Sequence, residues 1–367
     1  MSPSHILGTN RIFRIACIPG DGIGIDITKA AIKVLQKLSD TVGTFTFDFE
    51  IFDWSSTTFK ERGYYMPPDG FEQLKAYDAI YFGAVGWPDV PDHISLWGLI
   101  LPIRNSLNQY VNVRPTRILR GITSPLSNCP PTSLNWVIIR ENSEGEYAGH
   151  GGTTHAHSSH TIATEVSIFT RIGCERIFRF AFETARSRPR KKLTMVTKSN
   201  AQRHGMVLWD QIFAEIKEEY PDVEVDKMLV DAMTVRMVLH PQSLDTIVAT
   251  NLHADILSDL AAALSGSIGI AASSNLDPTR ENPSMFEPIH GSAPDIAGKG
   301  IANPVGAFWS AAEMVRWLGF EEAANVLMEC VENVTEASIK TRDLGGEKGT
   351  EEVTEAVCLE IEKVIGK

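Results

Sequence analysis

The segment that decides the fold is RIACIPGDGIGIDITKAAIKVLQKL, residues 14–38, in which a short apolar run is followed by a glycine-rich turn and a long helical pattern. In the second half of this segment, apolar residues recur at helical spacing from Ile27 onward. Further strand-like runs follow in FTFDFEIFDW (45–54), AIYFGAVG (79–86) and WVIIREN (136–142). Short strands that alternate with helices are typical of βα units around a sheet. The sequence therefore predicts an α/β fold.

The glycine-rich turn does not match the standard dinucleotide-binding fingerprint. That fingerprint places its third glycine three positions after the second, whereas Gly24 follows Gly22 by two. Asp21 also brings a negative charge to the place where a pyrophosphate would bind. We therefore expect a tight strand-to-helix turn here, without a Rossmann dinucleotide site and without a ribose-binding role for Glu50.

The rest of the chain continues the α/β pattern and ends in helices. We expect a helix over about 166–186, the strand LTMVTK (193–198), a helix over about 206–219 and another in NLHADILSDLAAALSG (251–266). After the loop GSAPDIAGKGIANP, three amphipathic stretches predict three helices, and Thr350 is the expected N-cap of the last one. The Pro/Ser-rich stretch TSPLSNCPP is interpreted as a loop.

Composition argues against several classes of protein. The formal net charge of −12 makes a phosphate backbone an unsuitable partner, so we expect no nucleic-acid binding. No stretch approaches the roughly 18 apolar residues of a membrane span, and the opening MSPSHILGTNRIF lacks the apolar block of a secretory signal. We therefore expect a cytoplasmic protein without a membrane partner. The five scattered cysteines form no C-x-x-C pair and are interpreted as ordinary buried thiols.

Two aspartates with helical spacing are the first candidates for a metal site. Asp255 and Asp259 lie four residues apart, so a helix presents both on one face, where like charges repel. Such a pair is usually a solvated surface, but the apolar residues around it place this helix against a core. Asp231, at the end of the strand MLVD, is the third candidate. Three carboxylates and substrate oxygens suit octahedral Mg²⁺ or Mn²⁺.

Three arginines suggest a dicarboxylate substrate. Arg104 and Arg114 bracket the segment RNSLNQYVNVR, and Arg140 ends the strand WVIIR. Guanidinium groups bind carboxylates through paired hydrogen bonds, although each arginine taken singly is better explained by a surface salt bridge. Tyr147 and Lys198 are the candidate proton carriers, because nearby positive charge favours the neutral amine that a general base requires. The sequence alone does not bring these two residues together.

The histidines of GHGGTTHAHSSH, which are His150, His155, His157 and His160, are not expected to bind metal. Their spacing is irregular, the intervening residues are mainly Gly, Thr and Ser, and no acidic or thiol ligand is adjacent. We expect a mobile polar loop.

These motifs, in this order, resemble the isocitrate and isopropylmalate dehydrogenase family of metal-dependent β-decarboxylating dehydrogenases. The match extends from IPGDGIG through RENSEGEY, VTKSN, VDAM and NLHADILSD to FEPIHGSAPDIAGKGIANP. DAIYFGAVGWPDVPDHISLWG, QYVNVRP and SRPRKKLT are most similar to the tartrate dehydrogenase/decarboxylase and D-malate dehydrogenase branch. The resemblance implies a two-domain, isopropylmalate dehydrogenase-like fold and not a standard Rossmann domain. The cofactor-binding domain would comprise residues 1–109 and 267–367, and the second domain residues 110–266.

The resemblance also implies roles for the catalytic, substrate and metal residues. Tyr147 and Lys198 would carry protons, and Trp97, in the segment SLWG, would favour a small substituent on the substrate. The remaining assignments are Arg104, Arg114 and Arg140 to the substrate carboxylates, and Asp231, Asp255 and Asp259 to Mg²⁺ or Mn²⁺.

The implied cofactor is NAD, bound along the late Gly/Pro loop. Glu287 and His290 would lie near the ribose and pyrophosphate, Asn303 by the adenine and Asn200 at the nicotinamide end. A carboxylate accepts hydrogen bonds from a 2′-hydroxyl but repels a 2′-phosphate, so Asp295 on the adenosine ribose favours NAD over NADP. A monovalent cation such as K⁺ is a further cofactor that we include.

The expected activity is NAD-dependent and Mg²⁺- or Mn²⁺-dependent oxidation, with β-decarboxylation, of a small 2-hydroxy dicarboxylate such as D-malate or tartrate. The family is typically homodimeric with shared active sites, and Lys198 and Asp231 would serve the neighbour's site. The alternatives are a 3-isopropylmalate dehydrogenase, or a relative with an altered substrate, and a non-catalytic regulatory subunit. The regulatory subunit is disfavoured because the chain retains Tyr147, Lys198 and the three aspartates.

Three positions depart from the family pattern. His253-Ala254 replaces the usual Phe-Gly before the first metal-binding aspartate, Ile25-Asp26 replaces Pro-Glu after the glycine turn, and Arg203-His204 follows one turn after Lys198. None of them removes a catalytic group, but the first and third leave the physiological substrate open.

Overall fold

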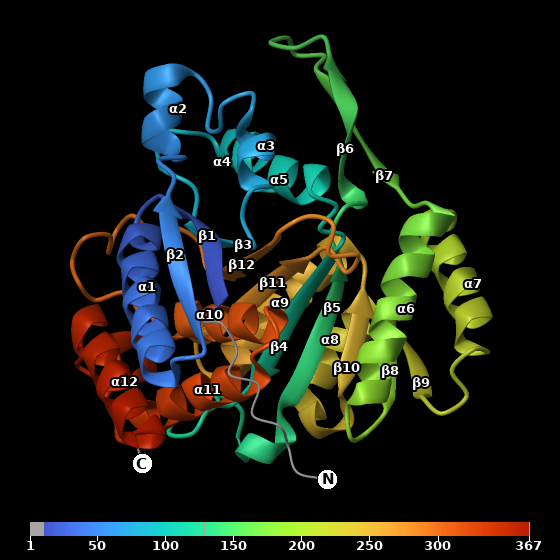
Figure 1. Ribbon diagram of the computed structural model, residues 1–367. Coiled ribbons are helices and arrows are strands. Elements are labelled where there is room, and N and C mark those ends of the chain that lie inside the picture. Colours follow the sequence, from blue (N-terminus) through green and yellow to red (C-terminus); the bar gives the residue numbers. More distant parts are fainter. Residues whose placement is uncertain (1–10, 128, 367) are drawn as a thin grey trace.

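The computed structural model describes residues 11–366 with the exception of residue 128. The first ten residues and the last one, which the expected first domain includes, lie outside this description, as does one residue of the predicted TSPLSNCPP loop. Figure 1 shows a large sheet flanked by helices, with a two-stranded arm that projects away from it. The α/β prediction is confirmed.

Ten strands form the large sheet in the order β2-β1-β3-β12-β11-β4-β5-β10-β8-β9. Their bounds are β1 Arg11–Gly20, β2 Phe45–Ile51, β3 Ala79–Ala84, β4 Val111–Arg117, β5 Asn135–Glu141, β8 Lys192–Thr197, β9 Glu224–Leu229, β10 Thr246–Ala249, β11 Ala272–Leu276 and β12 Ser284–Pro288.

The centre of this sheet is antiparallel and its two flanks are parallel. β11 pairs antiparallel with both β12 and β4, and β4 pairs antiparallel with β5, whereas the remaining neighbours are parallel. The five strands up to β11 come from the expected cofactor-binding domain, and the five from β4 onward come from the expected second domain. The predicted domain division would therefore cross the sheet between β11 and β4, where the two halves are hydrogen-bonded to each other.

Helices cover the sheet and connect its strands. The α-helices are α1 Ile23–Val42, α2 Ser56–Arg62, α3 Gly70–Leu74, α4 Asp92–Ser95, α5 Leu101–Ser106, α6 Arg171–Ser187, α7 Gly205–Lys217, α8 Val230–Leu239, α9 Asn251–Ser265, α10 Val305–Trp317, α11 Glu321–Glu336 and α12 Thr350–Ile365. Short helical turns of other types are the π-helix η1 Leu96–Ile100 and the 3₁₀ turns η2 Pro131–Ser133, η3 Pro241–Ser243, η4 Ile268–Ile270 and η5 Arg342–Leu344.

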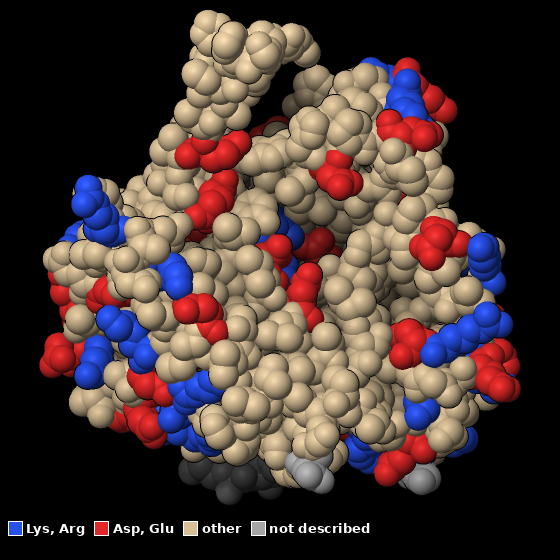
Figure 2. All heavy atoms as spheres, turned by 180° about the vertical axis from the view of Figure 1, so that it is seen from behind, with Lys and Arg blue, Asp and Glu red and all other residues tan. Residues whose placement is uncertain are grey.

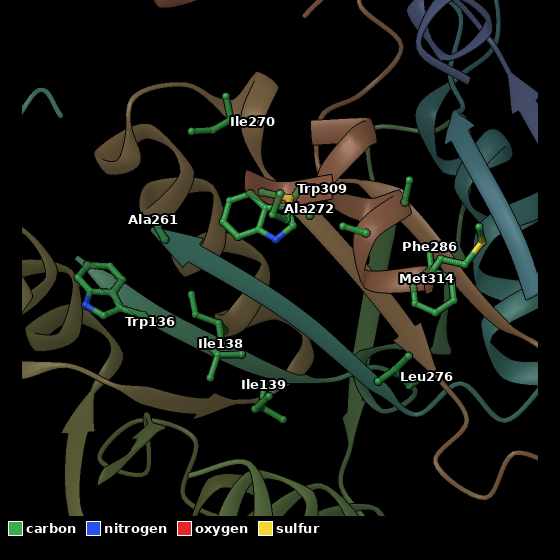
Figure 3. Packing of buried hydrophobic residues seen from close by; sticks show 14 of the residues in the cluster. Trp136, Ile138, Ile139, Ala261, Ile270, Ala272, Leu276, Phe286, Trp309 and Met314 are labelled. Atoms are coloured by element: carbon green, nitrogen blue, oxygen red, sulfur yellow. The ribbon is translucent and has the colours of Figure 1, made fainter. Parts of the chain in front are cut away.

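The core lies between these helices and the sheet. Figure 3 shows Trp136 and Ile138 of β5 in the same buried cluster as Ala272 of β11 and Trp309 of α10. Because residues from both halves of the sheet belong to this cluster, apolar packing continues across the β11–β4 junction.

The glycine turn between β1 and α1 is the predicted tight strand-to-helix connection. Gly20 has a φ of 68°, and a Cβ there would lie 1.9 Å from the carbonyl oxygen of Ala84. Asp21 is buried and accepts hydrogen bonds from the backbone N–H and hydroxyl of Ser56 and from the N–H of Gly86. Its carboxylate therefore connects the turn to the start of α2 and to the loop after β3, which explains the charge at this position.

The histidine-rich segment corrects the sequence prediction. The first half of the expected polar loop belongs to β6 Gly145–Thr154, which pairs antiparallel with β7 Ile162–Ile168 to form the arm in Figure 1, whereas residues 155–160 form the turns at its tip. Its outer part is exposed, with His150 on β6 and the other three histidines at the tip. β-branched residues in IATEVSI favour the strand, whereas the predicted helix over about 166–186 includes the last three residues of this segment.

Two helix starts and one strand end also differ from prediction. α6 begins at Arg171, where the Thr170 hydroxyl accepts a hydrogen bond from the N–H of Gly173 at 3.0 Å. Thr350 is the first residue of α12 and not its cap, because its hydroxyl donates to the carbonyl oxygen of Ala302 at 2.6 Å. Asp231 lies in the first turn of α8, two residues after β9 ends.

No helix among the described residues is long and apolar enough to cross a membrane. Four of the five cysteines are buried, as expected, whereas Cys129 is partly exposed.

Candidate active site

A cavity of about 210 Å³ lies beside the central antiparallel strands. Figure 2 shows a hollow below the arm in which basic and acidic side chains lie together. Seven of the residues predicted from sequence line the cavity: Arg104 of α5, Arg114 of β4, Arg140 of β5, Tyr147 of β6, Asp255 of α9, Glu287 of β12 and His290 just beyond it. The structure thus brings together side chains from six different elements.

Two of the three arginines meet at one carboxylate. Arg114 and Arg140 are buried, and both form ion pairs with Oδ1 of Asp255, Arg114 at 3.4 Å and Arg140 at closer range. Burial and the charge of Arg140 lower the pKa of Arg114 to about 9, and burial also lowers the pKa of Arg140. Two buried cations side by side create a strong demand for anions at this wall of the cavity.

Asp255 and Tyr147 face each other across the cavity. Burial alone would raise the pKa of Asp255, but Arg140 and Arg114 outweigh it and leave that pKa lowered. The Tyr147 hydroxyl lies 3.4 Å from Oδ2 of Asp255, and burial and this carboxylate raise the tyrosine pKa. The phenol is therefore held in its protonated form, which suits a proton donor.

Asp259 lies one helical turn after Asp255. Burial and the charge of Asp255 raise the pKa of Asp259. The predicted like-charge repulsion between these aspartates is therefore present in the structure.

The third arginine pairs with a different carboxylate of the cavity. Arg104 donates from Nη2 to Oε1 of Glu287 at 2.7 Å, and both side chains are buried. His290, two residues after the end of β12, borders a second cavity of about 370 Å³ that Asn303 and Asp343 also line. The buried Nε2 of His290 has no hydrogen-bond partner among the residues described. Asp295 is exposed and lies between Ala293 and Ile296, which both line this second cavity.

Lys198, Asp231 and Asn200 do not line either cavity. Lys198 Nζ instead donates to Oδ1 of Asp231 at 2.5 Å, on an exposed part of the surface, and this hydrogen bond lowers the aspartate pKa. In the described part of the chain, no three His, Cys, Asp or Glu side chains gather into a group that could hold a metal ion. One chain therefore brings Asp255 and Asp259 to the same helix but does not add Asp231.

Trp97 lies beside the cavity rather than in it. With Tyr147 and Gly149 it lines a neighbouring hollow of about 580 Å³ at the base of the arm. Gly149 has a φ of 73°, and a Cβ there would lie 2.6 Å from the Trp97 ring. Only glycine allows this close contact between the arm and the π-helix η1.

Several polar residues that the sequence analysis did not single out hold the arginines in place. Asn251 Oδ1 accepts from Nε and Nη2 of Arg140 at 2.9 and 2.6 Å, and the Ser258 hydroxyl accepts from Arg114. Asn112 and Asn275, both fully buried in central strands, belong to the same network. The sequence contains a signal for these two asparagines. Asparagine is depleted in strands, and a buried amide requires hydrogen-bond partners, so an asparagine within a buried strand indicates a polar network.

Comparison with known proteins identifies relatives along almost the whole chain. Residues 14–357 match the family described as isocitrate/isopropylmalate dehydrogenase. A probable tartrate dehydrogenase/decarboxylase of Agrobacterium vitis is 63% identical over 348 residues, covering 95% of this chain and 97% of the relative. The decarboxylating D-malate dehydrogenase of Escherichia coli (strain K12) is 46% identical over 355 residues, covering 95% of this chain and 98% of the relative. The crystal structure of isocitrate dehydrogenase from Methylococcus capsulatus has a TM-score of 0.85 at 36% identity, with 95% of this chain and 99% of that chain covered.

These findings confirm the resemblance to the family and to its tartrate and D-malate branch, and they confirm the isopropylmalate dehydrogenase-like fold. The prediction of a decarboxylating dehydrogenase agrees with the names of both relatives. On the match over residues 14–357 and these identities, the chain belongs to the isocitrate/isopropylmalate dehydrogenase family.

Proposed function

We propose that the protein catalyses the NAD-dependent and Mg²⁺- or Mn²⁺-dependent oxidation, with β-decarboxylation, of a small 2-hydroxy dicarboxylate such as D-malate or tartrate. The observation that carries this proposal is the convergence of three buried arginines, Asp255 and Tyr147 on one cavity of about 210 Å³. The names of the relatives support the same substrate class, since they act on tartrate and D-malate.

Substrate binding follows from the arginines. Three guanidinium groups face the carboxylates of Asp255 and Glu287, so the cavity keeps an excess of positive charge for a dianionic ligand. Arg114 and Arg140 would bind one substrate carboxylate and Arg104 the other. The small volume and the ring of Trp97 beside it favour a compact substituent over a branched one.

The carboxylates of α9 fit a divalent cation. Asp255 and Asp259 offer hard oxygen ligands, and burial together with the charge of Asp255 raises the pKa of Asp259, so a cation would favour the ionised form of both carboxyls. When bound, the cation supplies positive charge beside the hydroxyl and carboxylate oxygens of the substrate. Tyr147, held protonated by its raised pKa, would then deliver a proton to the carbon that loses carbon dioxide.

The cavity beyond His290 fits a dinucleotide. Its lining is largely apolar, as an adenine requires, and Asn303 contributes an amide. Glu287 and His290 would lie near the ribose and pyrophosphate, Asn200 at the nicotinamide end and Asp295 at the adenosine ribose, where its charge favours NAD over NADP. NAD, when bound, accepts the hydride from the substrate carbon.

A homodimer would complete the site. Lys198 and Asp231 lie outside the cavity of their own chain, and we assign them to the site of a second copy, with Lys198 as the base for the substrate hydroxyl and Asp231 as the third metal ligand. α8, which carries Asp231, packs against α9, which carries Asp255. Exposed apolar side chains, which mark interaction surfaces, lie on both helices: Val235, Val238 and Leu239 on α8 and Ile256 on α9.

The test follows NADH formation with D-malate, the tartrate isomers, isopropylmalate and isocitrate in the presence of Mn²⁺, and repeats the assay with NADP. We expect turnover of D-malate and tartrate, with at least roughly tenfold preference for NAD, because a carboxylate near a 2′-phosphate costs more than about 1.4 kcal/mol. Efficient use of isopropylmalate without D-malate would contradict the substrate assignment. Ligand binding without any NADH formation would point to a regulatory subunit.

A further inference from the structure

Two asparagines at the centre of the sheet form a polar link between the two ends of the cavity. Asn112 of β4 and Asn275 of β11 are direct partners across the antiparallel pair and are fully buried. We propose that these two residues are positioning residues that fix Glu287 toward the cofactor and Arg114 toward the substrate. The proposal rests on the proposed function, which assigns those two ligands.

Hydrogen bonds connect the four side chains without a gap. Arg114 donates from Nε to Oδ1 of Asn112 at 2.7 Å, and Asn112 donates from Nδ2 to Oδ1 of Asn275 at 2.9 Å. Asn275 in turn donates from Nδ2 to Oε1 of Glu287 at 2.7 Å. The chain of bonds therefore begins at a substrate guanidinium and ends at a cofactor carboxylate.

The charges at the two ends fix the direction of every bond. An arginine only donates and an ionised glutamate only accepts, so Asn112 must present its oxygen to Arg114 and Asn275 its amide nitrogen to Glu287. The two amide dipoles consequently point the same way, and each bond strengthens the next in this low-dielectric interior. If either side-chain amide were rotated by 180°, a donor would face a donor on one side and an acceptor would face an acceptor on the other.

This arrangement leaves the ligand-facing atoms oriented. Arg104 and Asn275 both donate to Oε1 of Glu287, so Oε2 remains for a cofactor hydroxyl. At the Arg114 end, Asn112 accepts a hydrogen bond from Nε, while the Ser258 hydroxyl and Asp255 accept from Nη1. Nη2 of Arg114 is then left for a substrate carboxylate.

The two links come from different parts of the sheet. Asn112 lies on the first strand of the expected second domain, and Asn275 on a strand of the expected cofactor-binding domain. A disturbance at Asn112 should therefore reach the cofactor through Asn275, although Asn112 itself contacts a substrate arginine. A residue that only fills space would have no such remote effect.

The decisive variant is Asn275→Asp, which keeps the shape and the accepting oxygen but removes the donor to Glu287 and places a carboxylate beside it. We expect the dissociation constant for NAD, measured by tryptophan fluorescence, to rise roughly tenfold or more. The difference in NAD affinity between this variant and the parent should become smaller as the pH is lowered, because a protonated carboxyl at position 275 can again donate to Glu287. Asn325→Asp is the matched control: it makes the same chemical change at an exposed acceptor of Arg316, remote from the cavity, and should bind NAD like the parent.

Asn112→Asp is the second test variant. It tests the proposal by itself if circular dichroism shows that Asn275→Asp does not fold. It keeps the acceptor for Arg114 but loses the donor to Asn275, and we expect weaker NAD binding together with a higher KM for D-malate. Folded variants that bind NAD as the parent does at every pH would overturn the proposal, even if their thermal stability is lower. The proposed function is tested separately, with the unsubstituted protein. If that protein binds NAD but does not oxidise D-malate, the substrate assignment is wrong, and the comparison of NAD binding still tests the role of the asparagines.

Discussion

The central cavity and the surface around Lys198 satisfy their charges in different ways. In the cavity, buried arginines are neutralised by Asp255 and Glu287 and held by amides and hydroxyls of the same chain. On the surface, Lys198 has Asp231 as an exposed partner and lies away from the cavity. The difference teaches that one chain completes the polar wall of the cavity by itself, whereas the roles proposed for Lys198 and Asp231 would require a second copy of the chain.

The largest expected effect comes from Asp255→Asn, which removes the negative charge that both Arg114 and Arg140 contact in the cavity. We expect Mn²⁺-dependent turnover to be lost. Because Asp255 neutralises two buried arginines, the variant should also be less stable by roughly 1–3 kcal/mol, discounted for its partial exposure. The repulsion from Asp259 alone would suggest the opposite sign, so the direction of the change in unfolding midpoint distinguishes the two effects.

Asp259→Asn serves as the comparison for that result. It should also reduce metal-dependent turnover, but it should leave stability unchanged or slightly raised, because it relieves repulsion and breaks no buried ion pair. Near-normal turnover and metal dependence in both variants would refute the metal site on α9.

Mixing two inactive chains tests the dependence on a second copy. A Lys198→Met chain and an Asp255→Asn chain should each be inactive, but after exchange of subunits one site of the heterodimer would contain both intact residues. We expect partial recovery of activity, measured by NADH formation, and no recovery when either variant is mixed with itself. Subunit exchange can be verified by mass spectrometry of differently tagged chains. If the mixture exchanges subunits and stays inactive, each site is built within one chain.

Tyr147→Phe perturbs the cavity without disturbing its walls. The ring keeps its place over the Arg140 guanidinium, 5.3 Å from ring centroid to Cζ, while the proton donor is lost. We expect overall turnover to fall about a hundredfold or more, as is typical for removal of a general acid. Oxaloacetate supplied directly should still lose carbon dioxide in the presence of Mn²⁺. An unchanged rate of NADH and carbon dioxide formation from D-malate would remove Tyr147 from the proton-transfer role.

Sequence patterns predicted the parts of the molecule that depend on local periodicity. The strand-to-helix turn at Asp21, the helix that carries Asp255 and the strand that ends near Arg140 are all present. The sequence does not predict the arm because the run from Ile162 to Ile168 is short, and its last three residues fall within the helix expected over about 166–186. Capping at Thr350 was wrong because its hydroxyl finds a partner in a distant loop.

The asparagines of the polar network carry a sequence signal, but the connections between them could not be predicted, since they depend on pairing between distant segments. Asn112 and Asn275 are 163 residues apart and meet only because β4 and β11 are neighbours in the sheet. Motif resemblance identified Arg114 and Glu287 at the ends of this network, but it gave no reason to connect them. Such connections become visible only when strand order and register are known.

The smallest expected effect concerns the contact between the arm and Trp97. Gly149→Ala would place a methyl group against the indole ring and impose a left-handed backbone on alanine, so the Trp97 ring must shift from its present place. We expect a several-fold fall in kcat/KM for D-malate and a smaller fall for isopropylmalate, because the displaced ring no longer restricts the larger substituent. Gly152→Ala, on the same strand with no atom within 4 Å of the new Cβ, should behave like the parent. If both variants discriminate between the two substrates as the parent does, Trp97 does not set substrate size, and selectivity must reside in the walls of the cavity itself.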